Sequence, residues 1–136
     1  MNIGEAARLS NVSAKMIRYY EEVGLLPEPA RSAAGYRYYS DGDVALLTFV
    51  SHLRELKFSV KQMSEIVELW RNPGRASKDV KRIALAHSEA LAERANKLNE
   101  MSDALRLLAD RCHGDDNPEC AILDGLADTL PEASRT

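Results

Sequence analysis

Residues 77–112 carry apolar side chains at alternating spacings of three and four, the spacing of an a/d seam in a coiled coil. The eleven positions of this seam are Ser77, Val80, Ala84, His87, Leu91, Arg94, Leu98, Met101, Leu105, Leu108 and Cys112. Seven of them are apolar, and no Gly or Pro interrupts the span. The pattern predicts one continuous helix of roughly 50 Å. So small a domain cannot bury this seam alone, so we expect the helix to pair with its copy in a two-fold dimer.

The start of the chain predicts two short helices joined by a tight turn. Asn2 with Glu5 reads as a capping box that opens a helix over about residues 3–9, and Ser13 caps a second helix. Gly24 ends the second helix because glycine tolerates a left-handed conformation. Two helices joined in this way form a helix-turn-helix, which is typical of a DNA-binding unit.

Beyond these helices the pattern changes to that of a β-hairpin wing. Pro27 and Pro29 break the helix, and Gly35 allows a tight turn. Residues 36–39 then alternate as in a short strand. Two more capping boxes follow, and they predict helices over about residues 41–56 and 60–71. The boxes pair Ser40 with Asp43 and Ser59 with Gln62.

These elements predict a mainly α protein. We expect a winged helix-turn-helix DNA-binding domain with its connecting helices over residues 1–71, and a dimerisation helix over 77–112. A loop and short helix over 112–127 and a flexible tail over 128–136 complete the chain.

Charge and composition restrict the function. The formal net charge is −3, and residues 1–60 carry seven Lys/Arg against seven Asp/Glu. This balance counts against indiscriminate DNA binding but permits a few arginines gathered on one face. The chain has neither a long apolar run nor a basic-then-apolar leader, so we expect a cytoplasmic protein. The histidines are scattered and no catalytic set is apparent, so we expect no enzyme.

Cys112 and Cys120 are the only cysteines, and seven residues separate them. Asn117 as N-cap and Pro118 as the first helical residue place Cys120 in the first turn of a short helix, where its pKa is lowered. Two thiolates across a short loop suit linear coordination of Cu(I), whereas zinc normally takes four ligands. The alternatives are two buried hydrophobic thiols, a redox pair, or a site in which His113 is a third ligand.

Residues suited to DNA contact lie on the second helix and on the predicted wing, because arginine and tyrosine bind phosphates and arginine also reads guanine. On the helix they are Lys15, Arg18, Tyr19 and Tyr20, and on the wing Arg31, Tyr36 and Arg37. The alternative is that the tyrosines belong to the core, above all Tyr20, which lies three residues after Ile17.

Two segments, residues 17–27 (IRYYEEVGLLP) and 35–39 (GYRYY), resemble the signature of MerR-type transcription regulators. The resemblance covers about residues 1–127. The Cys112–Cys120 loop is similar to that of the copper-efflux regulators of this family, the CueR and HmrR type. Ser77 also agrees with the members that sense monovalent metals. The chain departs from many copper members at Ala121 and His113, where proline is common.

The resemblance implies a metal-dependent activator. A homodimer with an antiparallel coiled coil would bind double-stranded promoter DNA, with Ser77 of one subunit supporting the thiol pocket of the other. Cu(I), with Ag(I) or Au(I) as surrogates, would be the effector. The metal-bound form would distort the promoter so that RNA polymerase transcribes copper-efflux genes. The alternatives left open are a redox-sensing or divalent-metal-sensing regulator, and a copper-buffering or thiol-exchange protein.

Overall fold

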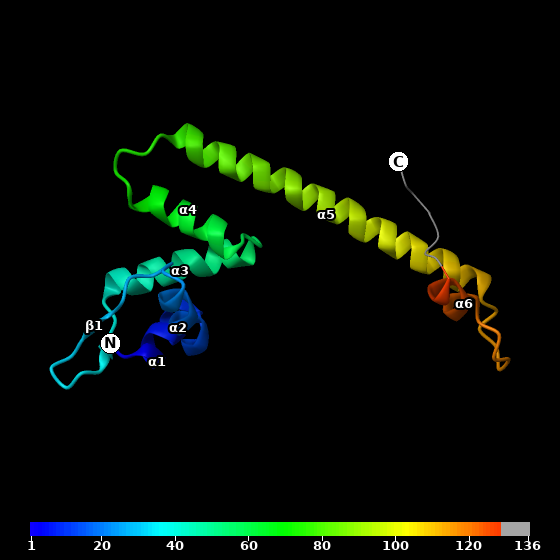
Figure 1. The fold of residues 1–136 in the computed structure, drawn as a ribbon, viewed down its shortest axis with the longest axis horizontal. Coiled ribbons are helices and arrows are strands. Elements are labelled where there is room, and N and C mark those ends of the chain that lie inside the picture. The colour runs from blue at the N-terminus through cyan, green and yellow to red at the C-terminus, as the bar shows by residue number, and fades with distance from the viewer. Residues whose placement is uncertain (129–136) are drawn as a thin grey trace. The chain divides into compact units, whose positions relative to one another are not determined.

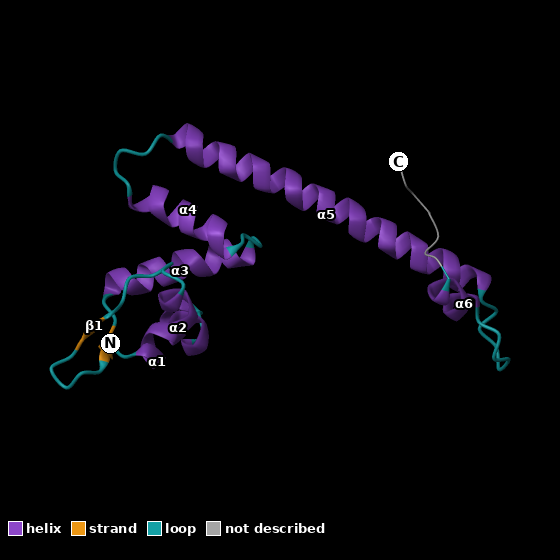
Figure 2. Ribbon diagram, viewed as in Figure 1, coloured by secondary structure: helices purple, strands orange, loops and turns teal. Residues whose placement is uncertain are grey.

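The structure is a computed structural model that describes residues 1–128 (Figure 1). It divides into two compact units, Met1–Lys81 and a second that begins at Arg82. Helices make up most of the described residues, with one small hairpin (Figure 2). This confirms the expected mainly α fold. Within residues 1–128, no helix has the length and apolar character needed to cross a membrane.

The first unit begins with the predicted helix-turn-helix, α1 (Ile3–Ser10) and α2 (Ala14–Glu22). The expected N-caps form: Asn2 Oδ1 accepts the backbone N–H of Glu5 at 2.9 Å, and Ser13 Oγ accepts that of Met16. The capping box predicted at Asn2 is only half formed, because α1 has the hydrogen bond to the Asn2 side chain without the return bond from the Glu5 side chain. Gly24, with φ of 81°, follows the end of α2 and turns the chain toward the wing.

The wing consists of β1 (Ala30–Arg31) and β2 (Arg37–Tyr38), which pair antiparallel with Ala30 opposite Tyr38. The connecting turn passes through Gly35, whose φ of 85° requires glycine's freedom. The predicted hairpin is therefore present, although each strand is only two residues long.

Helices α3 (Asp41–Glu55) and α4 (Val60–Arg71) complete the unit, and both predicted capping boxes form with both of their hydrogen bonds. The buried core joins side chains from α1, α2, the wing, α3 and α4. Its members are Ala6, Val12, Ile17, Tyr20, Leu25, Leu26, Tyr39, Leu46, Leu47, Val50, Leu53, Met63 and Val67. The core thus fixes the helix-turn-helix and the end of the wing on α3.

Helix α5 (Ser77–Arg111) is the predicted long helix, continuous over 35 residues. Ser77, the first position of the predicted seam, is its first residue. The predicted tail, apart from Asp128, lies outside the described residues.

The predicted start of the last helix is wrong, because α6 spans Ala121–Ala127 rather than beginning at Pro118. Asn117 does not cap it. Its backbone N–H donates to Asp115 Oδ1 at 3.0 Å, which closes a local turn. This Asx turn satisfies Asn117 locally, and the helix begins only after Cys120, which becomes its N-cap residue.

Candidate functional site

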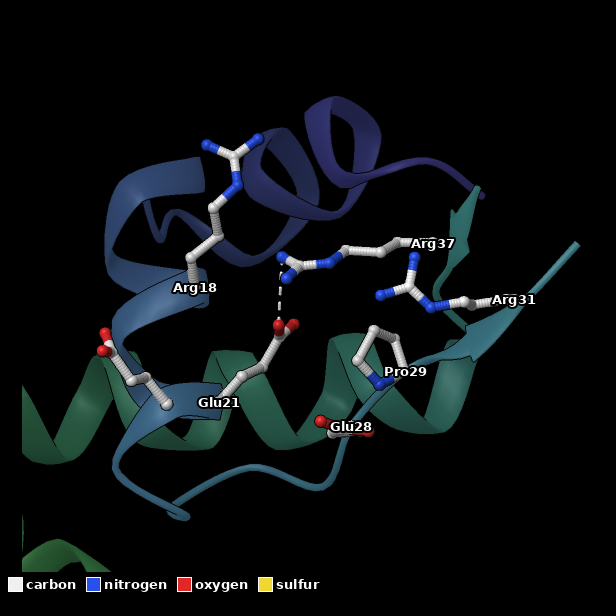
Figure 3. Close-up of a pocket in the computed structure, with 7 residues that line it drawn as sticks. Arg18, Glu21, Glu28, Pro29, Arg31 and Arg37 are labelled. Atoms are coloured by element: carbon white, nitrogen blue, oxygen red, sulfur yellow. Dashed lines mark ion pairs between the residues drawn. The ribbon is translucent and has the colours of Figure 1, made fainter. Parts of the chain in front are cut away.

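The structure brings the predicted arginines of α2 and the wing together around one pocket. Arg18 comes from α2, whereas Arg31 and Arg37 come from the two strands (Figure 3). The pocket has a volume of about 270 Å³, and Glu21 and Glu22 also line it. Elements separated along the chain thus place three arginines around one pocket, and arginine is a residue type that binds phosphate groups. The carboxylate of Glu28 lines the pocket as well.

A carboxylate that we did not predict organises this pocket. Glu21 Oε2 lies 3.1 Å from Nη1 of Arg37, as an ion pair without the geometry of a directed hydrogen bond (Figure 3). Glu21 Oε1 accepts the hydroxyl of Tyr39 at 2.6 Å. The Arg31 Nη1 donates to Gly35 O at 3.0 Å and so braces the turn of the wing. Sequence reasoning missed Glu21, although it lies three residues after Arg18 on the same face of α2.

The other predicted DNA-contact residues differ in exposure. Lys15, Tyr19 and Tyr36 are exposed and available to a ligand. Tyr20 is only 1% exposed and lies in the core, where burial raises the pKa of its hydroxyl. Its predicted DNA contact is therefore wrong, because the side chain packs inward from α2. Tyr38, two residues after Tyr36 on the wing, is exposed and was not singled out; strand alternation could have found it.

The two thiols meet at the end of α5. Cys112 follows the last residue of α5, and the Cys112 and Cys120 Sγ atoms are 3.8 Å apart, with both residues half-buried. Two features bring them together. Gly114, with φ of 66°, turns the chain back. Gly125 of α6 packs so closely on Leu108 of α5 that a Cβ added there would collide with the leucine.

Cys120 has a lowered pKa, as the sequence predicted, although it lies at the N-cap. The main cause is the backbone N–H of Leu123, which faces the sulfur without forming a full capping hydrogen bond. The N–H of Ile122 and the Cys112 thiol lower the pKa further, whereas desolvation and the carboxylate of Asp124 raise it. The net effect favours the thiolate, the form that binds metal.

The pair is compatible with one bridging metal ion. Metal–thiolate bonds are about 2.3 Å long for zinc, so two such bonds span up to about 4.6 Å. The observed 3.8 Å between the sulfur atoms lies within that reach. Among residues 1–128, no His, Cys, Asp or Glu joins the thiols in a group of three that could hold a metal. His113 is exposed, and Ser77 lies in the first unit of the chain. A role for either residue beside the two thiols therefore stays a prediction.

Comparison with known proteins gives matches over nearly the whole chain. A sequence model of the MerR family regulatory proteins matches residues 2–39, and one described as MerR, DNA binding matches residues 44–108. Heavy metal-dependent transcription regulator 2 of Rhizobium meliloti (strain 1021) is 49% identical over 127 residues, covering 93% of this chain and 86% of the relative.

Two further relatives agree with these matches. The HTH-type transcriptional regulator CueR of Salmonella typhimurium is 37% identical to this chain over 127 residues. The match covers 93% of this chain and 92% of that relative. Among solved structures, the transcription regulator PbrR691 from Ralstonia metallidurans CH34 in complex with lead(II) superposes with a TM-score of 0.79 at 28% identity. That match covers 93% of this chain and 98% of the other.

Proposed function

This chain belongs to the MerR family of transcription regulators, and we propose that it is a metal-dependent activator that senses Cu(I) through Cys112 and Cys120. Family membership makes it a regulator rather than an enzyme. The observation that carries the proposal is the pair of Sγ atoms 3.8 Å apart. No third ligand joins them within the described residues.

Two sulfur ligands favour a soft monovalent ion. Cu(I) accepts two thiolates, and Ag(I) and Au(I) share this chemistry, whereas structural zinc takes four ligands. The lowered pKa of Cys120 favours the thiolate, the form that binds metal. When bound, the ion would neutralise part of the charge of two thiolates. The residues that hold it would be Cys112 at the end of α5 and Cys120 at the start of α6.

A homodimer completes the proposal. Seam residues of α5 expose large apolar side chains in the single chain, among them Leu98 at 63%, so a second copy of α5 is the natural partner. In an antiparallel pair, the partner's copy of Ser77 would lie near Cys112 and support the thiol pocket. Serine is a poor metal ligand, so this arrangement keeps the site at two thiolates.

The DNA-binding part of the proposal assigns α2 and the wing to promoter DNA. Arg18, Arg31 and Arg37 would bind phosphates or bases, with Lys15, Tyr19 and Tyr36 adding contacts from exposed positions. Because residues 1–60 carry equal numbers of basic and acidic side chains, sequence-dependent DNA shape would contribute to recognition. Metal binding would change the promoter's shape so that RNA polymerase, in the cytoplasm, transcribes copper-efflux genes.

Metal-dependent transcription in vitro tests the proposal. Under anaerobic conditions, we expect Cu(I) or Ag(I) to raise transcription from the bound promoter, and zinc to have little effect. Cys112→Ser and Cys120→Ser should each abolish the response while promoter binding persists. His113→Ala is the matched control and should respond like the wild type. Loss of promoter binding in both cysteine variants would contradict the separation of sensing from DNA binding.

A thiol redox switch is the second candidate, and the same distance favours it. Sulfur atoms 3.8 Å apart need to approach to about 2.05 Å to form a disulfide, and Cys120 is inclined to the thiolate that begins the reaction. Oxidant given without metal would then change transcription, and a reductant would restore it. A response to Cu(I) in the presence of reductant favours the metal sensor instead.

A further inference from the structure

The wing is too small to hold its own position. Its strands β1 and β2 have two residues each, and an isolated two-stranded hairpin is marginally stable in water. Backbone hydrogen bonds between Met1 and Tyr39 anchor the end of the wing. The orientation of the Arg37 side chain against α2 depends in addition on side-chain contacts between the wing and the helix. Such contacts determine whether the arginines of the pocket can bind the same DNA site at once.

Glu21 provides such contacts to two wing residues at once. One oxygen of its carboxylate accepts a hydrogen bond from the Tyr39 hydroxyl at 2.6 Å. The other oxygen lies 3.1 Å from Arg37 Nη1. The Glu21 side chain is only 7% exposed, and Tyr39 is buried in the core. Burial, together with this hydrogen bond, raises the pKa of Tyr39 to about 12, so the hydroxyl remains a donor at neutral pH.

The charge of Glu21 is unfavourable for simple phosphate binding. It lies among Arg18, Arg31 and Arg37, where a carboxylate repels phosphate and reduces the positive charge available to DNA. Removing the charge alone would therefore strengthen binding to any DNA. Its contacts to the wing work in the opposite direction, because they hold Arg37 in one orientation rather than many.

We propose that Glu21 is a positioning residue for DNA recognition, which fixes Arg37 and Tyr39 of the wing against α2. It raises the discrimination between the operator and other DNA rather than the total affinity. This inference rests on the proposed function, since it assumes that α2 and the wing together bind promoter DNA.

Binding of the full-length protein to two duplexes tests the inference. One duplex is enriched by the wild-type protein from a random library, and the other is a scrambled duplex of the same composition. For Glu21→Gln, we expect the ratio of the two affinities to fall about tenfold. Binding to the scrambled duplex should stay equal or become tighter.

Glu22→Gln is the matched control. Glu22 is the next residue of α2, lines the same pocket and loses the same charge, but it is exposed and has no ion pair among the described residues. Its substitution should change both affinities alike and leave their ratio unchanged. Equal effects of Glu21→Gln and Glu22→Gln on the ratio would overturn the inference, since charge alone would then account for both.

Tyr39→Phe provides a second test that keeps the buried ring and removes only the hydroxyl. We expect a smaller fall in the ratio, and a fall smaller than the sum of the two when it is combined with Glu21→Gln, because both changes act on the same network. An unchanged ratio in Tyr39→Phe would contradict the network even if Glu21→Gln did not fold. If the wild-type protein enriches no sequence, the proposed function itself fails, which is a different outcome.

Discussion

The Sγ atoms of Cys112 and Cys120 lie 3.8 Å apart, although seven residues separate the two cysteines in the chain. The approach depends on how α6 returns to the end of α5. It is not a property of the loop alone, because Gly125 packs directly on the buried Leu108. The sensing geometry proposed for the chain therefore depends on this packing.

Gly125→Ala should disturb the thiol pair from a distance. The added methyl group would collide with Leu108, and overpacking of this kind typically costs about 1–3 kcal/mol, only partly offset by the better helix propensity of alanine. We expect faster hydrogen exchange in α6 and weaker Cu(I) binding. Gly42→Ala in α3 is the control, because its Cβ would meet Ser40 Oγ only at an ordinary contact of 3.6 Å. Equal Cu(I) affinity in both variants would contradict the role of this packing.

The seam of α5 should control the oligomeric state. Leu98 is on the proposed interface and 63% exposed in the single chain. Leu98→Lys would place a charge in the seam, so we expect a dimer dissociation constant at least about tenfold higher, measured by sedimentation. Asn96→Lys adds the same charge at an exposed position outside the seam and should leave the dimer intact. A wild-type protein that sediments as a monomer would rule out this interface.

Ser77→Cys tests whether the pairing is antiparallel. If the partner's copy of Ser77 lies near Cys112 and Cys120, the substitution supplies a third thiolate. We expect the affinity for divalent soft ions such as Pb(II) to rise by at least about tenfold, since more thiolate ligands favour them. Ser88→Cys, farther along α5, serves as a control for the added thiol. No gain for Ser77→Cys over this control would count against the antiparallel arrangement.

The stability of the DNA-binding unit should fall at high pH through Tyr39. Its pKa is raised from 10.0 to about 12, first by burial and then by its hydrogen bond to Glu21. The folded protein therefore keeps a proton that the unfolded chain releases, and the free energy of unfolding should decrease between about pH 10 and about pH 12. Below that range, the contribution of the protonated hydroxyl is fully present.

Tyr39→Phe isolates this effect from those of the other tyrosines. The variant should lose about 1–2 kcal/mol of stability near neutral pH, with the loss of a hydrogen bond to a charged group. Its difference from the wild type should shrink as the pH rises above 10.0, the ordinary pKa of tyrosine. Denaturant unfolding of both proteins across this range measures the difference. A difference that stays constant with pH would show that Tyr39 does not titrate as described.

Elements with local signals were predictable from the sequence. The capping boxes at Ser40 and Ser59 marked the starts of α3 and α4, because a cap depends on residues only three positions apart. The regular seam likewise predicted α5. At Asn117 two local structures competed, and the turn with Asp115 formed in place of a helix cap. The sequence alone does not decide between two such short-range arrangements.

Features that depend on tertiary packing were harder to predict from the sequence. Tyr19 and Tyr20 are chemically alike and adjacent, yet one is exposed and the other is buried, because only the second joins the hydrophobic core. Glu21 was missed for the same reason. Its partners Arg37 and Tyr39 are far along the chain and approach it only when the wing folds back. The proximity of the two thiols could be suspected from the short loop, but the close packing at Gly125 could not.

Anaerobic titration of the purified protein with Cu(I), followed by X-ray absorption at the copper edge, tests the central claim most directly. The account predicts one ion per subunit bound by two sulfur ligands, lost in Cys112→Ser and Cys120→Ser and retained in His113→Ala. A mixed nitrogen and sulfur environment, or binding that survives in either cysteine variant, would contradict the two-thiolate sensor.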